Sequence, residues 1–461
     1  MKAADLARRY RNYDGWLPPT VADRLAEHGH LAELRRLAER GDWCCADRLA
    51  RALFERHETE AAVRVLRPFV DTGWWNAVQV LVDFHDRRGE TDIAIAIVRG
   101  ALEKGSPHGI ERLGTLLAER GQVDEAVALL WPHAGEDAVL DALVELTEGH
   151  GYDGELTALV REQIEADSSV WSWNATAVLA TLLERQGRVD EALEVLTGSA
   201  FGEHGVFVNA VEQLADILAR HGRERQLREL VAGGGGEHAV FRLAVWLESL
   251  DRVDEAVEAM RPFATDGSPN VAAALAELLT RHGRADEAIE VLLPVPRLMG
   301  GDPEWLVGIL GKLLVERGRA DEAVAAVDDL AAHYGGMWIE LLFERVEVLA
   351  RSGRVEQAIA ELRAHHEGGT WYGSSKLADL LVLAGRPGEA IRTLESIDGS
   401  AWTAARLAVL LVDQGHVEEA LALFAPDEAP AGDEDRAFWR QFHREGRVTG
   451  GEPTRTIDRR T

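Results

Sequence analysis

The sequence predicts an all-α fold, an α-solenoid of about thirteen helix–turn–helix repeats. Three observations lead to this prediction: a turn residue recurs along the chain, a leucine lies four residues before it, and an alanine lies five residues after it. In the stretch LTRHGRADEAIEVLLP, at 279–294, these residues are Leu279, Gly283 and Ala288. A solenoid grows by adding similar units, so the length of 461 residues does not require several separate domains.

The turn residues are spaced by 28 to 36 residues, and eleven of the thirteen are glycine. Leucine occupies the position four residues earlier in eleven repeats, and a small residue is usual seven residues earlier. Apolar residues at helical spacing before each turn predict a first helix of about 14 residues, roughly 21 Å long. The turn residues are Gly29, His57, Gly89, Gly121, Gly151, Gly187, Gly222, Asp251, Gly283, Gly318, Gly353, Gly385 and Gly415.

Each turn glycine is expected to end a first helix, because glycine adopts the left-handed conformation without a Cβ clash. The sequence Asp-Glu-Ala, or a near equivalent, then predicts a second helix with carboxylates at its positive end. Proline eleven residues after the turn predicts the end of that helix or a kink in it. This proline is present at Pro68, Pro132, Pro262 and Pro294.

Composition shifts outside the array predict a cap before it and a tail after it. Four glycines at 233–236 predict a hinge within the array. The tail begins with an acidic stretch that is unlike a folded segment, followed by a short amphipathic pattern. The predicted organisation is an N-terminal cap (1–20), the repeat array (21–425), an acidic linker (426–435), an amphipathic helix (436–447) and a disordered tail (448–461).

The charge balance argues against several classes of partner. The formal net charge is −29 and the pI is about 5.0, whereas nucleic-acid binders usually display a basic patch. No apolar run is long enough to cross a bilayer, and the N-terminus lacks the apolar core of a signal peptide. We therefore expect a cytoplasmic protein that binds neither nucleic acid nor membrane. Lysine provides only four of the 50 basic residues, which is typical of a GC-rich bacterial genome.

The sequence contains no recognisable catalytic, cofactor or metal motif. A phosphate-binding loop, a His-Glu-x-x-His helix and a Gly-x-Ser-x-Gly elbow are all missing. Cys44 and Cys45 are adjacent and cannot form a relaxed disulfide, so we interpret them as packing residues, with a redox or metal-sensing role as the alternative. We predict that the protein is not an enzyme and has no cofactor.

The repeat unit resembles the tetratricopeptide repeat family, in which a leucine–small pair, a turn glycine and an alanine recur in this order. Leu275, Ala276, Leu279, Gly283 and Ala288 carry the pattern in one unit. The resemblance covers about residues 15–425 and implies a right-handed superhelix whose first helices line a concave groove. It also implies a scaffold or peptide-binding role. The short period and the prolines are similar in part to Sel1-like repeats.

On this resemblance, the positions ten and six residues before each turn face the groove. They carry eleven acids and only two basic residues, Arg51 and Lys312. The acids form either a solvated face or a surface that attracts a basic segment. They are Asp23, Asp47, Asp83, Glu111, Asp141, Glu145, Glu212, Asp216, Glu277, Glu347 and Asp379.

Aromatic residues gather on the same face of the first helices in the C-terminal half and predict a binding surface for an apolar, weakly basic segment. One candidate occupant is the chain's own tail at 436–447. Tryptophans fourteen residues before a turn, such as Trp43 and Trp371, are interpreted as staples between repeats, whereas for Trp16, Trp305 and Trp402 exposure to the groove and burial are equally open. The predicted binding residues are Phe241, Trp305, Phe343, Tyr372, Trp402, Asp216, Glu277, Glu347 and Asp379.

Two other functions are compatible with the sequence. A structural subunit of a larger complex would have a uniformly polar groove and apolar outer surfaces. An uncharted enzyme would have carboxylates or histidines converging in a deep pocket.

Overall fold

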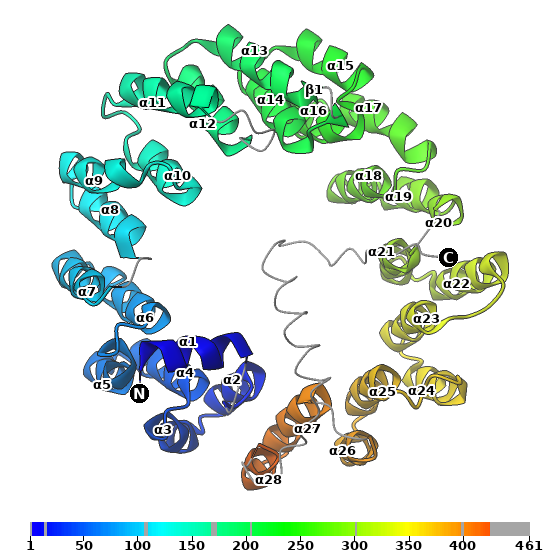
Figure 1. Cartoon of the computed structure of the whole chain (residues 1–461). Coiled ribbons are helices and arrows are strands. Elements are labelled where there is room, and N and C mark those ends of the chain that lie inside the picture. Colours follow the sequence, from blue (N-terminus) through cyan, green and yellow to red (C-terminus); the bar gives the residue numbers. More distant parts are fainter. Residues whose placement is uncertain are drawn as a thin grey trace, which may run out of the picture. The chain divides into compact units, whose positions relative to one another are not determined.

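The computed structural model describes residues 2–12, 16–105, 109–166, 173–202, 205–299, 302–397 and 401–424. This part of the chain is helical throughout, apart from one two-residue antiparallel pairing of β1 (Phe201–Gly202) with β2 (Gly205–Val206). A helix precedes and another follows each of the thirteen turn residues (Figure 1). The prediction of an all-α chain of helix pairs is confirmed.

The contacts divide the chain into two units, which are described separately. Unit 1 comprises Met1–Arg120 and His366–Thr461. Its helices are α1 (Ala3–Asn12), α2 (Pro19–Glu27), α3 (Leu31–Glu39), α4 (Trp43–Glu55), α5 (Thr59–Val70), α6 (Trp75–Asp86), α7 (Thr91–Glu103), α8 (Gly109–Glu119), α25 (Trp371–Leu383), α26 (Pro387–Glu395), α27 (Ala401–Asp413) and α28 (Val417–Ala422).

Unit 2 comprises Gly121–His365. Its helices are α9 (Val123–Leu130), η1 (Trp131–His133), α10 (Asp137–Leu146), α11 (Asp153–Ala166), α12 (Trp173–Arg185), α13 (Val189–Ala200), α14 (Val208–Arg220), α15 (Glu224–Ala232), α16 (Gly236–Ser249), α17 (Val253–Thr265), α18 (Pro269–Arg281), α19 (Ala285–Leu292), α20 (Val295–Leu298), α21 (Glu304–Glu316), α22 (Ala320–Tyr334), α23 (Ile339–Arg351) and α24 (Val355–Ala364).

All thirteen turn residues have positive φ, including the two that are not glycine, His57 at 64° and Asp251 at 60°. In most repeats, the amide after the turn residue then donates to the carbonyl of the residue four positions before the turn, which is usually leucine. In the repeat of Gly283, Arg284 N lies 2.8 Å from Leu279 O. This is the Schellman closure that ends a helix and satisfies its last carbonyls. The predicted C-cap is confirmed.

The core of each unit lies between first and second helices. Leu279 and Ala288, the leucine before and the alanine after one turn, are both fully buried. The small residue seven positions before the turn permits close packing. A Cβ added to Gly311 would lie 2.8 Å from Val348 Cγ2 on the next first helix. The prediction that this position lets two helices approach closely is thereby supported.

The prolines have two different outcomes. Helices α9 and α19 end at Leu130 and Leu292, shortly before Pro132 and Pro294. Pro132 lies inside the short 3-10 helix η1, and Pro294 directly precedes the short helix α20. Pro68 and Pro262 instead lie inside the last turns of α5 and α17. The prediction that proline ends or kinks the second helix is therefore confirmed, as an end of the helix, in two of the four repeats.

The segments flanking the array are only partly described. The N-terminal cap contains α1, whose Leu6 is fully buried. Gly233, Gly234 and Gly235 form the tight connection between α15 and α16, and Gly236 begins α16. A Cβ on Gly235 would lie 2.7 Å from Leu230 O. A hinge at this connection stays a prediction. The predicted linker (426–435), amphipathic helix (436–447) and tail (448–461) lie outside the described residues.

Candidate binding surface

A recurring ion pair joins the first helices of successive repeats. An acid six residues before one turn pairs with an arginine nine residues before the next turn. Within the described residues, the pairs are Asp23–Arg48, Asp83–Arg112 and Asp379–Arg406 in unit 1, and Asp216–Arg242 in unit 2. The sequence analysis identified these acids but not their arginine partners. Positions counted within one repeat do not show which side chain of the next repeat lies beside them.

Three aromatic side chains meet on α25 and α27 in unit 1. The ring of Trp371 lies 5.4 Å from the rings of both Tyr372 and Trp402, in edge-to-face arrangements. Trp371 is 43% exposed, and the Tyr372 hydroxyl donates to Glu367 Oε1 at 2.9 Å. Trp371 therefore contacts the next repeat, as the staple interpretation predicts, but it also presents much of its surface to solvent. We call Trp371, Tyr372 and Trp402 the aromatic cluster.

Two of the predicted binding residues, Tyr372 and Trp402, thus come together, and a third lies on the same helix as Tyr372. Asp379 is exposed, two turns along α25, and pairs with Arg406 of α27. Val382 is exposed on the same stripe of α25, whereas Val412 of α27 is buried at 1% exposure. The surface around the cluster is therefore both apolar and charged.

The predicted binding residues of unit 2 are distributed over five repeats. Phe241, Trp305 and Phe343 are partly buried. Glu277 is exposed and pairs with Arg281 at 3.1 Å, and Glu347 pairs with Arg351 at 2.8 Å. The residues and their helices are Asp216 on α14, Phe241 on α16, Glu277 on α18, Trp305 on α21, and Phe343 and Glu347 on α23.

A second aromatic group lies at the N-terminal end and is buried. Trp16 is only 8% exposed, and its indole nitrogen donates to Gly41 O at 3.1 Å. The rings of Tyr10 and Trp74 pack against it, and Trp43 packs on Trp74 at 4.9 Å. Trp16 therefore belongs to the core of the first repeats, which resolves the question of its exposure in favour of burial.

A shallow depression of about 240 Å³ lies between the first helices α10 and α12 of unit 2. Its lining includes Asp141 and Glu145, two of the acids predicted to face a groove. Asn174 donates to Asp141 Oδ1 at 3.3 Å, and Arg185 donates to Val144 O at 2.6 Å. These contacts show that neighbouring first helices form a polar surface here.

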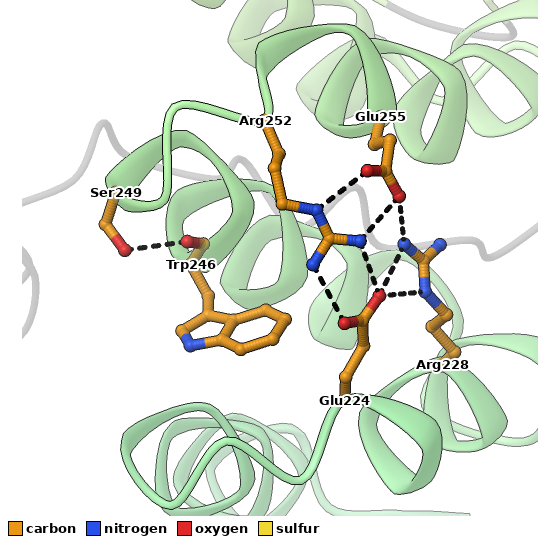
Figure 2. A network of polar contacts seen from close by, with 6 residues as sticks. All are labelled: Glu224, Arg228, Trp246, Ser249, Arg252 and Glu255. Atoms are coloured by element: carbon orange, nitrogen blue, oxygen red, sulfur yellow. Dashed lines mark hydrogen bonds and ion pairs between the residues drawn. The ribbon is translucent and has the colours of Figure 1, made fainter.

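A second recurring arginine, directly after the turn residue, joins the second helices. Figure 2 shows Arg252, which donates to Glu255 of its own helix at 2.7 Å and to Glu224 of the preceding second helix at 2.8 Å. Arg228 also binds both carboxylates. The hydrogen bonds from Arg252 and then Arg228 lower the pKa of Glu224 to about 2. The residues after the turn therefore link repeats, in addition to balancing the helix dipole.

The two cysteines are free and buried. Burial raises the pKa of the Cys44 thiol to about 12 and raises that of Cys45 as well. A reactive cysteine needs an accessible, low-pKa thiolate. This environment favours the packing interpretation over the redox alternative.

Neither a metal centre nor a membrane-spanning helix is found among the residues that the structure describes. Among these residues, no group of three or more His, Cys, Asp or Glu side chains is arranged to hold a metal ion. No described helix combines the length and the apolar character needed to cross a membrane.

Models of the tetratricopeptide repeat match residues 310–369, and also 173–196 and 401–426. The chain therefore contains tetratricopeptide repeats in these segments. Repeats of this type stack into extended surfaces that generally serve protein interactions. The similarity of the chain to Sel1-like repeats stays a prediction.

Three solved structures are similar to this chain over most of its length. The APC/C hetero-tetramer Cut9–Hcn1 has 16% identity, coverage of 92% of this chain and 90% of that chain, and a TM-score of 0.30. Naa15/Naa10 bound to HypK-THB has 15% identity, coverage of 90% of this chain and 73% of that chain, and a TM-score of 0.32. Yeast Tom70 has 12% identity, coverage of 92% of this chain and 95% of that chain, and a TM-score of 0.29. Similarities this low say nothing about the partner of this chain. A search of characterised protein sequences gave no match.

Proposed function

We propose that the chain is a non-catalytic, cytoplasmic scaffold that binds a protein or peptide segment, and that the aromatic cluster of Trp371, Tyr372 and Trp402 is the main contact. The observation that carries the proposal is the exposure of Trp371, at 43%, beside two further aromatic rings. Binding hot spots are enriched in tryptophan and tyrosine, because these side chains supply a large contact area with little loss of entropy.

The charges around the cluster favour a segment that combines apolar and basic residues. Glu367 lies beside Tyr372, and Asp379 lies further along the same helix. The formal net charge of −29 adds a long-range attraction for a basic partner. An acidic segment would meet repulsion from both sources. The proposed ligand therefore carries aliphatic or aromatic anchors with arginine or lysine beside them.

The experiment is selection of peptides from a displayed random library on the chain truncated after Phe424. Apolar-basic peptides should be enriched, and Trp371→Ala should weaken their binding by about tenfold or more, which is the size of a hot-spot effect. Leu293→Ala is the matched control, because Leu293 is 45% exposed but follows a second helix. Acidic selected peptides, or equal binding to the Trp371→Ala variant, would contradict the proposal.

The chain's own tail is a specific candidate for such a segment. Residues 436–447, RAFWRQFHREGR, contain three aromatics and four arginines and follow the last repeat by only a dozen residues. A synthetic peptide of this sequence should bind the truncated chain and change its tryptophan emission. It should also compete with the selected peptides. If the peptide does not bind, the tail is not the occupant, although an external ligand is still possible.

A structural subunit with broad contacts is the second candidate function. It is favoured by exposed leucines outside α25 and α27, namely Leu250, Leu293 and Leu298. Cross-linking of the native assembly followed by mass spectrometry distinguishes the two functions. Cross-links at these leucine-bearing ends would favour the structural subunit, whereas cross-links confined to α25 and α27 would favour the aromatic cluster.

A further inference from the structure

The first and the last repeat pack against each other within unit 1. Helix α2 of the first repeat lies against α27 of the last. The apolar residues of α2, which are Val21, Ala22 and Leu25, are all fully buried. Terminal repeats of a solenoid usually need a polar outer face to stay soluble. Here the two terminal repeats cover each other instead.

Ion pairs hold this contact at two levels. The Arg24 guanidinium donates to both oxygens of Asp413, with Nη2 at 2.9 Å from Oδ2. His28 Nε2 lies 3.1 Å from Asp413 Oδ1. Between the second helices, Arg36 of α3 lies 3.6 Å from Glu418 of α28. First helix meets first helix and second helix meets second helix, which is the arrangement of consecutive repeats.

The same recognition occurs inside the array. In unit 2, Arg220 and His221 of α14 both bind Glu184 of the preceding first helix, α12, with the histidine at 3.0 Å. His221, like His28, directly precedes its turn glycine. The repeat of α18 binds the repeat of α16 in the same manner, through Arg281 and His282 on Glu248. The last repeat therefore binds the first through the same types of side chain, an arginine and a histidine on one carboxylate, that join these successive repeats.

The terminal contact differs from the internal ones in its connection. Internal partners such as Glu184 and Arg220 are 36 residues apart, whereas Arg24 and Asp413 are separated by 389 residues. When the contact opens, each end exposes a surface that fits the opposite end of any copy of the chain. Exchange of identical contacts between protomers is a general route to self-association.

We propose that the α2–α3 end and the α27–α28 end form a head-to-tail self-association surface, whose partner is the opposite end of a second copy of this chain. The intramolecular contact and the intermolecular contact use the same residues and exclude each other. The closed monomer is favoured at low concentration because its two ends are held at a high effective concentration. This inference is independent of the aromatic cluster.

The test uses two charge reversals, Arg24→Glu and Asp413→Arg, in separate chains. Each variant alone places like charges together and should stay monomeric. An equal mixture restores a native Arg24–Asp413 pair at one contact and a reversed pair at the other. Light scattering should then show a species of twice the 50.6 kDa chain mass. A chain that carries both substitutions should return to the monomer.

A matched control applies the same design to an internal contact. Chains with Glu184→Arg and with Arg220→Glu should not dimerise when they are mixed, because the two helices belong to one continuous stretch. A monomeric mixture of the terminal variants, or a dimeric mixture of the internal ones, would overturn the proposal.

A second measurement does not depend on the folding of the charge variants. The wild-type chain, warmed to just below its unfolding temperature at high concentration and then cooled, should yield a dimer fraction that grows with concentration. A chain locked by a short bis-maleimide linker between Arg36→Cys and Glu418→Cys, with the buried Cys44 and Cys45 left unreacted, should yield none. Equal dimer fractions for the locked and unlocked chains would refute the proposal.

Discussion

The turn glycines permit a quantitative test, in which the same substitution has opposite effects at two sites. Gly283 has φ of +74°, and a Cβ placed on it would meet no atom within 4 Å. The effect of Gly283→Ala therefore comes from the backbone alone. An alanine in the left-handed conformation costs about 1–2 kcal/mol, and the smaller entropy of the unfolded alanine chain offsets about 0.5–1 kcal/mol. The repeat should lose about 0.5–1 kcal/mol of local stability.

Gly100 is the matched control. It lies inside α7, without positive φ, and a Cβ on it would also meet nothing within 4 Å. Gly100→Ala should stabilise its repeat by about 0.5–1 kcal/mol, because alanine has the higher helix propensity.

Hydrogen exchange measured by mass spectrometry is the suitable assay, since long repeat arrays open locally and do not unfold in one step. Gly283→Ala should accelerate exchange in the peptide that contains the Arg284 amide, which bonds Leu279 O at 2.8 Å. The expected acceleration is about two- to fivefold, from the free energies above and RT. Unchanged or slower exchange would refute the argument that positive φ is the reason for glycine at this turn.

Three further predictions follow from individual contacts. Gly311→Ala should destabilise its repeat, because the new Cβ would lie 2.8 Å from Val348 Cγ2, and Val348→Ala should restore most of the loss in a thermal unfolding experiment. Cys44 and Cys45 should resist Ellman's reagent in the folded chain and react after denaturation, because both are buried and burial raises their pKa values. The pKa of Glu224 is lowered from 4.5 to about 2 in the folded chain, so its stabilising contribution is complete above pH 4.5 and is lost as the pH falls through about 2. The difference in thermal stability between wild type and Glu224→Gln should shrink over that interval.

The turn could be predicted from the sequence because its geometry is local. A left-handed residue, the leucine four positions before it and the alanine five positions after it all lie within one helix pair. His57 and Asp251 show how strongly this pattern determines the backbone, since both keep the left-handed conformation without being glycine. At these two positions the prediction therefore rested on the residues around the turn, chiefly the leucine before it and the alanine after it, and not on a glycine.

Contacts between repeats could not be predicted in the same way. The pairing of Asp379 with Arg406 depends on how far one first helix is displaced along the next. That displacement follows from the packing of many side chains and is not encoded at any single position. The contact of Arg24 with Asp413 was still less accessible, because the residues lie at opposite ends of the array. The aromatic cluster was partly predictable. Tyr372 and Trp402 were identified individually from the sequence, but the packing of both rings against Trp371 was not.

The ion pairs between first helices change how the acidic face can act. Asp379 already has a partner in Arg406, so a basic ligand gains less from it than from an isolated carboxylate. Exposed ion pairs typically contribute about 0–1 kcal/mol, which is too little to hold a ligand but enough to favour one register between repeats. The affinity of the proposed site should therefore come mainly from contact with Trp371 and its neighbours. The acidic charge of the chain would act mostly on the rate at which a basic segment arrives.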